Sequence, residues 1–291
     1  MAIVMGDNQY GKAEIRLLRV TRTGDVHEIR ELCVSTTLSG DFEAAHVRGD
    51  NSAVLPTDSQ RNAVYAFAAE APVGEIEDFG LRLARHFMAA APAVRRARVQ
   101  VDEGSWTRIV SGGEGHPHAF VRGGTERRQA LVVAGLDRAH VAAGLSDMVL
   151  LKSGGSEFRG FARDRYTTLE ETDDRILATA VTARWRFSSL DVDWAASFAA
   201  TRQAILTTFA CEHSPSLQQT LHDMGRAVLE ARPEIAEIRF SLPNRHHLAV
   251  DLAPFGLAGA GSVFQIADRP YGLIEGTVRR DEAPEGPALD W

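Results

Sequence analysis

Residues 194–231, WAASFAATRQAILTTFACEHSPSLQQTLHDMGRAVLEA, form the stretch that decides the fold. We predict two helices in it, over 194–209 and 217–231. The second is indicated by apolar residues at helical spacing: Leu217, Leu221, Met224 and Val228. Segments with strand character precede and follow the helix pair, at 148–161, 176–187, 237–252 and 263–278.

The first half of the chain repeats this order. Strands are predicted at 13–20 and 27–36, joined by a turn at Thr23-Gly24-Asp25; helices follow at 60–69 and 75–90, then strands at 97–109 and 118–133. A β-β-α-α-β-β unit gives a four-stranded antiparallel sheet with a helix pair on one face. We therefore expect an α+β protein with units at residues 1–140 and 141–280, and a loosely held tail at 281–291.

A sheet that is covered on one face only leaves open edges, which must be paired or hidden. Joining several such units edge to edge into a barrel would pair these edges, and it would require more than one chain. The pattern of elements therefore predicts an oligomer.

The composition excludes several classes of function. The 291 residues are 44% hydrophobic and 24% charged, as in a soluble globular protein, and the net charge of −7 argues against a general nucleic-acid binder. Cys33 and Cys211 lie far apart without metal or redox spacing, so we expect free thiols. Neither a signal peptide nor a membrane span is predicted, and the ending Leu289-Asp290-Trp291 is not a peroxisomal signal. We expect a cytoplasmic protein.

Four groups of residues carry a family resemblance: Tyr10-Gly11-Lys12, Leu55–Ser59, Leu151–Trp185, and Ser214–Gln218 together with Ser241–His246. Their order and separation, from Tyr10 to about Glu275, resemble the urate oxidase (uricase) family. Pro56 and Gly154 depart from its usual pattern, which has a small residue and a Thr there. The resemblance implies the tunnelling fold, with two units per subunit and four subunits stacked into a barrel. It further implies oxidation of urate by O2 and water to 5-hydroxyisourate and H2O2, in purine catabolism, without cofactor or metal.

The resemblance assigns substrate binding to Phe158, Arg175 and Gln218. Phe158 would stack on the purine, while Arg175 and Gln218 would grip two of its edges. The alternatives are a core phenylalanine in a strand, a surface salt bridge from Arg175 to Asp173 or Asp174, and a solvated glutamine. A helix start at Ser214-Pro215 would place Gln218 in the first turn, where the free N–H of Leu217 could also bind an anion.

The resemblance assigns the proton chemistry to Lys12, Thr57 and His246. Lys12 would deprotonate the Thr57 hydroxyl, which takes a proton from the substrate, and His246 would complete the relay. Asn244 would hold O2 or water over the ring; in a strand, residues 244 and 246 point to the same face. The alternatives are a surface lysine for Lys12 and a turn Asn and half-buried His after Pro243.

Asp58 would donate its backbone N–H to the opposite edge of urate, and Thr57 would also contact the substrate. The alternative for Thr57 is an N-cap of the following helix, which the Asp58 carboxylate could also cap.

Two other functions remain open at this point. A zinc-dependent pterin or purine cyclohydrolase or synthase of the same fold would use His and Cys ligands. His116-Pro117-His118 is a candidate for part of such a zinc site, but no third ligand lies at diagnostic spacing. A non-catalytic purine-binding oligomer is the third possibility, and the presence of Lys12, Thr57 and His246 argues against it.

Overall fold

The structure of the protein is a computed structural model, which describes residues 3–257, 261–284 and 286–287. The chain divides into two compact units. The first consists of Met1–Gly144, Arg186–Ala195 and Pro284–Trp291, and the second of Leu145–Trp185 and Ala196–Ala283.

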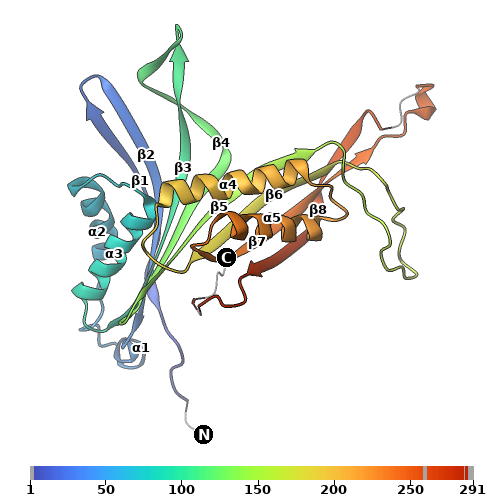
Figure 1. The fold of residues 1–291 in the computed structure, drawn as a ribbon. Helices are drawn as coiled ribbons and strands as arrows, with labels where there is room; N and C mark the ends of the chain where they lie inside the picture. The colour runs from blue at the N-terminus through green and yellow to red at the C-terminus, as the bar shows by residue number, and fades with distance from the viewer. Residues whose placement is uncertain (1–2, 258–260, 285, 288–291) are drawn as a thin grey trace. The chain divides into compact units, whose positions relative to one another are not determined.

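The first unit contains four strands and three helices: β1 (Tyr10–Thr23), β2 (Val26–Gly40), α1 (Glu43–Arg48), α2 (Thr57–Glu70), α3 (Ile76–Ala90), β3 (Val94–Ser111) and β4 (Glu114–Ala134). The strands pair antiparallel in the order β1-β2-β3-β4, with Val34 opposite Val101 and Val101 opposite Ala130. Helices α2 and α3 lie along one face of this sheet (Figure 1). Gly80 allows α3 to approach β4 closely, because a Cβ there would lie 2.8 Å from a Val132 methyl.

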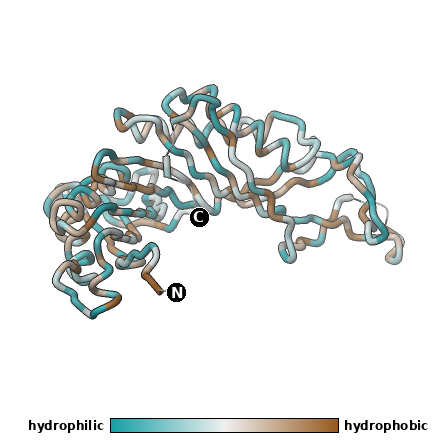
Figure 2. Tube along the Cα trace, turned by 90° about the horizontal axis from the view of Figure 1, so that it is seen from below, coloured by the Kyte–Doolittle hydropathy of each residue, from teal (hydrophilic) through white to brown (hydrophobic). Residues whose placement is uncertain are grey.

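Alternation along the strands separates the core from the opposite face of the sheet. On β2, every second residue from Leu32 to Leu38 is buried, and Val99 and Val101 of β3 are fully buried. Apolar and polar residues accordingly alternate along the chain trace (Figure 2). The helix layer therefore covers the apolar side of the sheet.

The second unit repeats the plan. It holds the greater part of β5 (Ala139–Lys152), β6 (Leu177–Phe187) and α4 (Trp194–Cys211), followed by α5 (Leu217–Ala231), β7 (Ile235–Ala249), the single-turn helix η1 (Ala253–Phe255) and β8 (Phe264–Arg279). The strand order is again sequential, and β7 pairs antiparallel with β8. Gly225 of α5 rests directly on Val278 of β8, where a Cβ would approach to 2.5 Å.

The predicted double β-β-α-α-β-β order is confirmed, with α5 at its predicted bounds. Two local predictions were wrong. The strand expected over 148–161 ends at Lys152, because Ser153-Gly154-Gly155 leaves the extended conformation and Gly155 has φ +70°. The first unit was predicted to contain two helices, and the short helix α1 is a third.

The prediction of a loosely held tail falls partly on Glu285 and Ala288–Trp291, which lie outside the described residues. In the described part of the chain, no helix combines the length and the apolar character that a membrane span needs.

Candidate functional site

In the first unit, Lys12 of β1 reaches the beginning of α2. Its Nζ donates to Asp58 Oδ1 at 3.2 Å, and Arg61 lies 3.5 Å from the same oxygen. The Lys12 hydrogen bond, together with the charges of Arg61 and Lys12, holds the pKa of Asp58 below its usual value. The structure thus brings Lys12 next to Asp58, the residue that follows Thr57, although Lys12 and Asp58 lie 46 positions apart in sequence.

A buried pair of polar side chains links β2 to α2 next to Lys12. The Thr36 hydroxyl of β2 donates to Gln60 Oε1 of α2 at 2.7 Å, and the Lys12 backbone N–H donates to Thr36 Oγ at 3.3 Å. Gln60 and Thr36 are both nearly inaccessible to solvent. The pairing of β1 with β2 shifts register immediately after Lys12, where Glu14 has φ +55°. This pair could not be predicted from the sequence, because its two residues belong to different elements.

Thr57 occupies the first position of α2, not the N-cap. Pro56 precedes the helix, and no side chain caps its N-terminus. The alternative readings of Thr57 and of the Asp58 carboxylate as caps were therefore wrong, since the Asp58 carboxylate accepts from Lys12 instead. The first N–H groups of the helix, including that of Asp58, have no partner within the helix.

In the second unit, the backbone of residues 155–158 connects three of the predicted binding residues. Arg175 N–H donates to Ser156 O at 2.7 Å, and Phe158 exchanges two hydrogen bonds with Thr172 at 2.9 and 3.1 Å. On the other side, Glu157 N–H donates to Ser214 O and Ser214 N–H to Gly155 O, two residues before the cap of α5. This segment therefore fixes Phe158, Arg175 and the beginning of α5 relative to one another.

Arg175 is a half-buried guanidinium without an ion pair among the described residues. The two carboxylates that could have paired with it are engaged elsewhere: Asp173 pairs with Arg159, and Asp174 accepts from Gly155 N–H at 2.8 Å. Its Nε is buried without a hydrogen-bond partner, and desolvation lowers the pKa of the guanidinium. The salt-bridge alternative was therefore wrong. A desolvated, unpaired guanidinium is suited to an anionic ligand.

Phe158 lies outside any strand and is half-buried, which excludes the alternative of a core strand phenylalanine. Its ring stacks on that of Phe161, with centroids 5.0 Å apart and planes inclined by 12°. The Arg175 Cζ lies 5.0 Å from the Phe158 centroid. One face of Phe158 is thus backed by a second ring, and the Arg175 guanidinium also lies over the Phe158 ring. Sequence reasoning missed this role of Phe161.

Helix α5 begins at Leu217, with Ser216 as its N-cap; the Ser216 Oγ accepts from Gln219 N–H at 3.2 Å. The predicted cap, Ser214, was wrong, because Ser214 is buried and its Oγ accepts from Thr220 Oγ at 2.8 Å. Gln218 is in the first turn as predicted, and its side chain is exposed. The Leu217 side chain is buried, which leaves its backbone N–H at the helix end for a ligand.

Asn244 and His246 both lie on β7, and both are half-buried. Asn244 is opposite Gly272 and His246 is opposite Ala267, so β8 contains extra residues between these two pairs. The pairing of β7 with β8 is therefore irregular between Asn244 and His246, whereas the prediction that both side chains point to the same face assumed a regular strand.

Four polar groups at these positions have no side-chain hydrogen bond to the described residues: the Thr57 hydroxyl, the amides of Gln218 and Asn244, and the His246 imidazole. Lys12, Thr57 and Asp58 belong to the first unit, and the other predicted site residues belong to the second.

The histidines of the predicted His116-Pro117-His118 motif lie on β4 with His27 nearby; ring centroids are 4.7 Å apart for His116 and His118, and 5.6 Å for His27 and His118. Throughout the described ranges, no three His, Cys, Asp or Glu residues are placed to hold one metal ion.

Known proteins resemble this chain over almost its whole length. The uricase family model matches residues 8–133 and again residues 141–275. The chain is 51% identical to a uricase of Arthrobacter globiformis over 280 residues, which cover 96% of this chain and 91% of that protein. It is 36% identical to a uricase of Danio rerio over 277 residues, 93% of each chain. The crystal structure of the Arthrobacter globiformis uricase superimposes with a TM-score of 0.93 at 49% identity, over 99% of this chain and 98% of that one. A family model that matches both halves, and relatives that align over almost the whole length, show that this chain belongs to the uricase family.

Proposed function

We propose that this protein is a urate oxidase, an oxidoreductase that converts urate, O2 and water into 5-hydroxyisourate and H2O2 without a cofactor or metal. The observation that carries the proposal is the half-buried, unpaired Arg175 guanidinium beside the Phe158 ring, which the backbone of residues 155–158 links to the segment before α5. Urate is a flat anion with hydrogen-bonding atoms along its edges. A cation, an aromatic face and backbone N–H groups are what such a ligand requires.

Substrate binding follows from these positions. Urate stacks on the face of Phe158 that Phe161 leaves open, and the Arg175 fork binds one edge through two parallel N–H donors. The Gln218 amide and the Leu217 N–H bind a second edge at the positive end of α5. Thr57 and the Asp58 N–H, at the beginning of α2, bind the opposite edge.

The proton chemistry belongs to Lys12, Thr57 and His246. The Lys12 amine takes the Thr57 proton as that hydroxyl removes one from urate, and His246 completes the relay. The electron-rich anion then gives two electrons to O2 held beside Asn244. Water adds to the oxidised ring, the product is 5-hydroxyisourate, and O2 leaves as H2O2. Asp58 supports the geometry because its carboxylate accepts a hydrogen bond from Lys12 Nζ at 3.2 Å, which holds this nitrogen at the beginning of α2.

We further propose that the protein is a homotetramer in the cytoplasm and that its active sites are shared between subunits. In each subunit, residues 1–140 and 141–280 act as two tunnelling-fold units, and residues 281–291 form a tail. Two observations support an assembly. Strand β1 begins the strand order and β8 ends it, and both expose large apolar side chains such as Leu18, Ile266 and Leu273. The two groups of site residues belong to different units, so a partner chain could complete each group.

One experiment tests the reaction itself. Protein dialysed against a strong chelator is mixed with urate, and the near-ultraviolet absorbance of urate is followed together with O2 uptake. We expect urate and O2 to disappear in equal amounts, at the rate of undialysed protein. Activity that is lost on chelation and returns with zinc, copper or iron would exclude the cofactor-free reaction. Consumption of a pterin or purine without O2 uptake would favour the cyclohydrolase alternative, and tight urate binding without turnover would favour a non-catalytic purine-binding oligomer.

A further inference from the structure

A second pocket, distant in sequence from the residues assigned to urate, lies in the first unit, and we propose that it binds small organic anions that carry a phosphate or carboxylate group. We name it the basic pocket and define it by Arg96, Val133, Leu136, Arg138, His140 and Pro287. Its volume of about 380 Å³ is within the range of small-molecule sites.

Two unpaired guanidiniums carry the argument. In the part of the chain that the structure describes, neither Arg96 nor Arg138 has an ion pair or a side-chain hydrogen bond. Asp137 also lines the pocket, but no ion pair joins it to either arginine. Guanidiniums that converge on one pocket without a carboxylate partner are suited to an oxyanion, which each can bind through two N–H donors.

A third arginine, Arg186, lies next to the basic pocket. Arg186 is buried and lines the adjoining small cavity together with His140 and Pro287. The tail crosses it so closely that a Cβ at Gly286 would lie 2.7–2.8 Å from the Arg186 side chain. Burial, together with the charges of Arg138 and Arg186, lowers the pKa of His140. Among the described residues, the causes of that shift include two arginines and no carboxylate.

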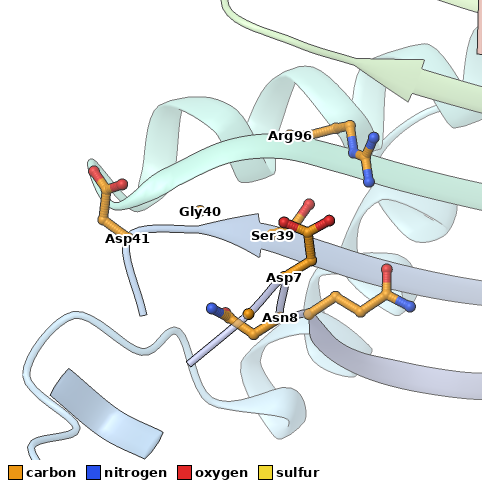
Figure 3. A pocket seen from close by; sticks show the side chains of 8 residues that line it. Asp7, Asn8, Ser39, Gly40, Asp41 and Arg96 are labelled. Carbon is orange, nitrogen blue, oxygen red and sulfur yellow. The ribbon is translucent and has the colours of Figure 1, made fainter. Parts of the chain in front are cut away.

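The carboxylates of the neighbouring pocket do not neutralise the arginines of the basic pocket. That pocket is lined by Asp7, Asn8, Ser39 and Asp41 and shares Arg96 with the basic pocket (Figure 3). Asp41 is already bound by Arg95, whose Nη2 lies 2.6 Å from Oδ2. Asp7 forms no ion pair with Arg96. The whole protein has a net charge of −7, which makes this local excess of cations more unusual.

The apolar side of the basic pocket specifies the rest of the ligand. Val133, Leu136 and Pro287 provide carbon surface next to the guanidiniums. A bare inorganic ion would leave this surface unused, whereas an anion with an aromatic or aliphatic body would cover it. We therefore expect an organic phosphate or carboxylate to bind more tightly than inorganic phosphate.

Calorimetric titration of the intact protein with phenyl phosphate tests the proposal, with inorganic phosphate as the bare anion and benzyl alcohol as the neutral body. We expect saturable binding of phenyl phosphate, weaker binding of inorganic phosphate and none of benzyl alcohol. Arg138→Gln should weaken phenyl phosphate binding at least about tenfold, since it removes charge-assisted hydrogen bonds. Arg85→Gln, the same charge change on the exposed face of α3, should leave binding unchanged.

Two further arms separate this site from the urate site and test His140. Arg175→Ala should retain phenyl phosphate binding; if binding is lost there but kept in Arg138→Gln, the ligand occupies the urate site and the proposal is overturned. An anion favours protonated His140, so the affinity of the unmodified protein should rise relative to that of His140→Gln as the pH falls through the titration of His140; the comparison cancels the protonation of the phosphate itself. Absence of saturable binding, with the fold of the protein intact, also overturns the proposal.

Discussion

Replacement of Arg175 by Ala tests the candidate urate site at the residue on which it most depends. A charge-assisted hydrogen bond contributes roughly 1.5–3 kcal/mol, and a guanidinium makes two to one edge of a planar ligand. Arg175 is only half-buried, so we take the lower end and expect a loss of about 3 kcal/mol, which weakens urate binding roughly 100-fold. The guanidinium has no protein partner among the described residues, and it is partly desolvated.

The same features predict that the fold tolerates the change. Removing an unpaired, desolvated cation breaks no ion pair, so the free energy of unfolding should change by less than about 1 kcal/mol, or roughly 2–4 °C in the unfolding midpoint. A loss of ligand affinity at constant stability would thus identify Arg175 as a binding residue.

Urate affinity should be measured by titration without O2, because turnover would otherwise mix binding with chemistry. Arg159→Ala is the matched control: Arg159 lies nearby, is exposed, and pairs with Asp173 at the surface. It should change urate affinity by less than about threefold. If Arg175→Ala binds urate as tightly as the unmodified protein, the assignment of Arg175 is refuted.

Further predictions concern the chemistry, the stacked rings, the assembly and the acid stability. Lys12→Ala or Thr57→Ala should lower kcat by at least about tenfold while anaerobic urate affinity stays within about threefold; a change confined to affinity would contradict their role in proton transfer. Phe161→Ala should raise the KM for urate more than it lowers kcat, because Phe158 loses the ring that backs it, and Phe161→Tyr should restore the KM. Mixed Lys12→Ala and Arg175→Ala subunits should regain activity after exchange, whereas fully exchanged mixtures that stay inactive would exclude shared sites. The pKa of Glu31 is lowered, first because Arg122 donates a hydrogen bond to its carboxylate at 2.5 Å. The stabilisation from this carboxylate is therefore present above the pKa of Glu31 in the unfolded chain and is lost as the pH falls through its pKa in the folded protein. Glu31→Gln should reduce the drop in the unfolding midpoint on acidification, and an unchanged drop would refute this.

Periodicity predicted the elements well because each element carries its own pattern. The apolar stripe from Leu217 to Val228 located α5, and residues with strand character located most of the strands. The choice between Ser214 and Ser216 as the cap could not be made in the same way. Ser214 is buried, and its backbone forms hydrogen bonds with Gly155 and Glu157, about 60 residues away in sequence. Such long-range contacts cannot be predicted from the local sequence.

The candidate site was predicted through its residue types and the family resemblance, and its supporting contacts were not. The Thr36–Gln60 pair, which fixes Lys12 near Asp58, joins β2 to α2, and either residue alone looks like an ordinary polar side chain. Phe161 resembled a strand residue until Gly155 and the end of β5 at Lys152 placed it in an irregular segment. Tertiary hydrogen bonds of this kind depend on chain topology, which periodicity does not encode.

The backbone hydrogen bonds of residues 155–158 limit which insertions and deletions this protein can accept. One short segment sets the spacing between an aromatic ring, a guanidinium and a helix end, through hydrogen bonds on both of its sides. An inserted or deleted residue there would displace all three together, whereas the exposed loop at 162–171 can vary in length without moving any of them. New ligand preferences can therefore arise by exchanging side chains on this frame, and not by altering its length.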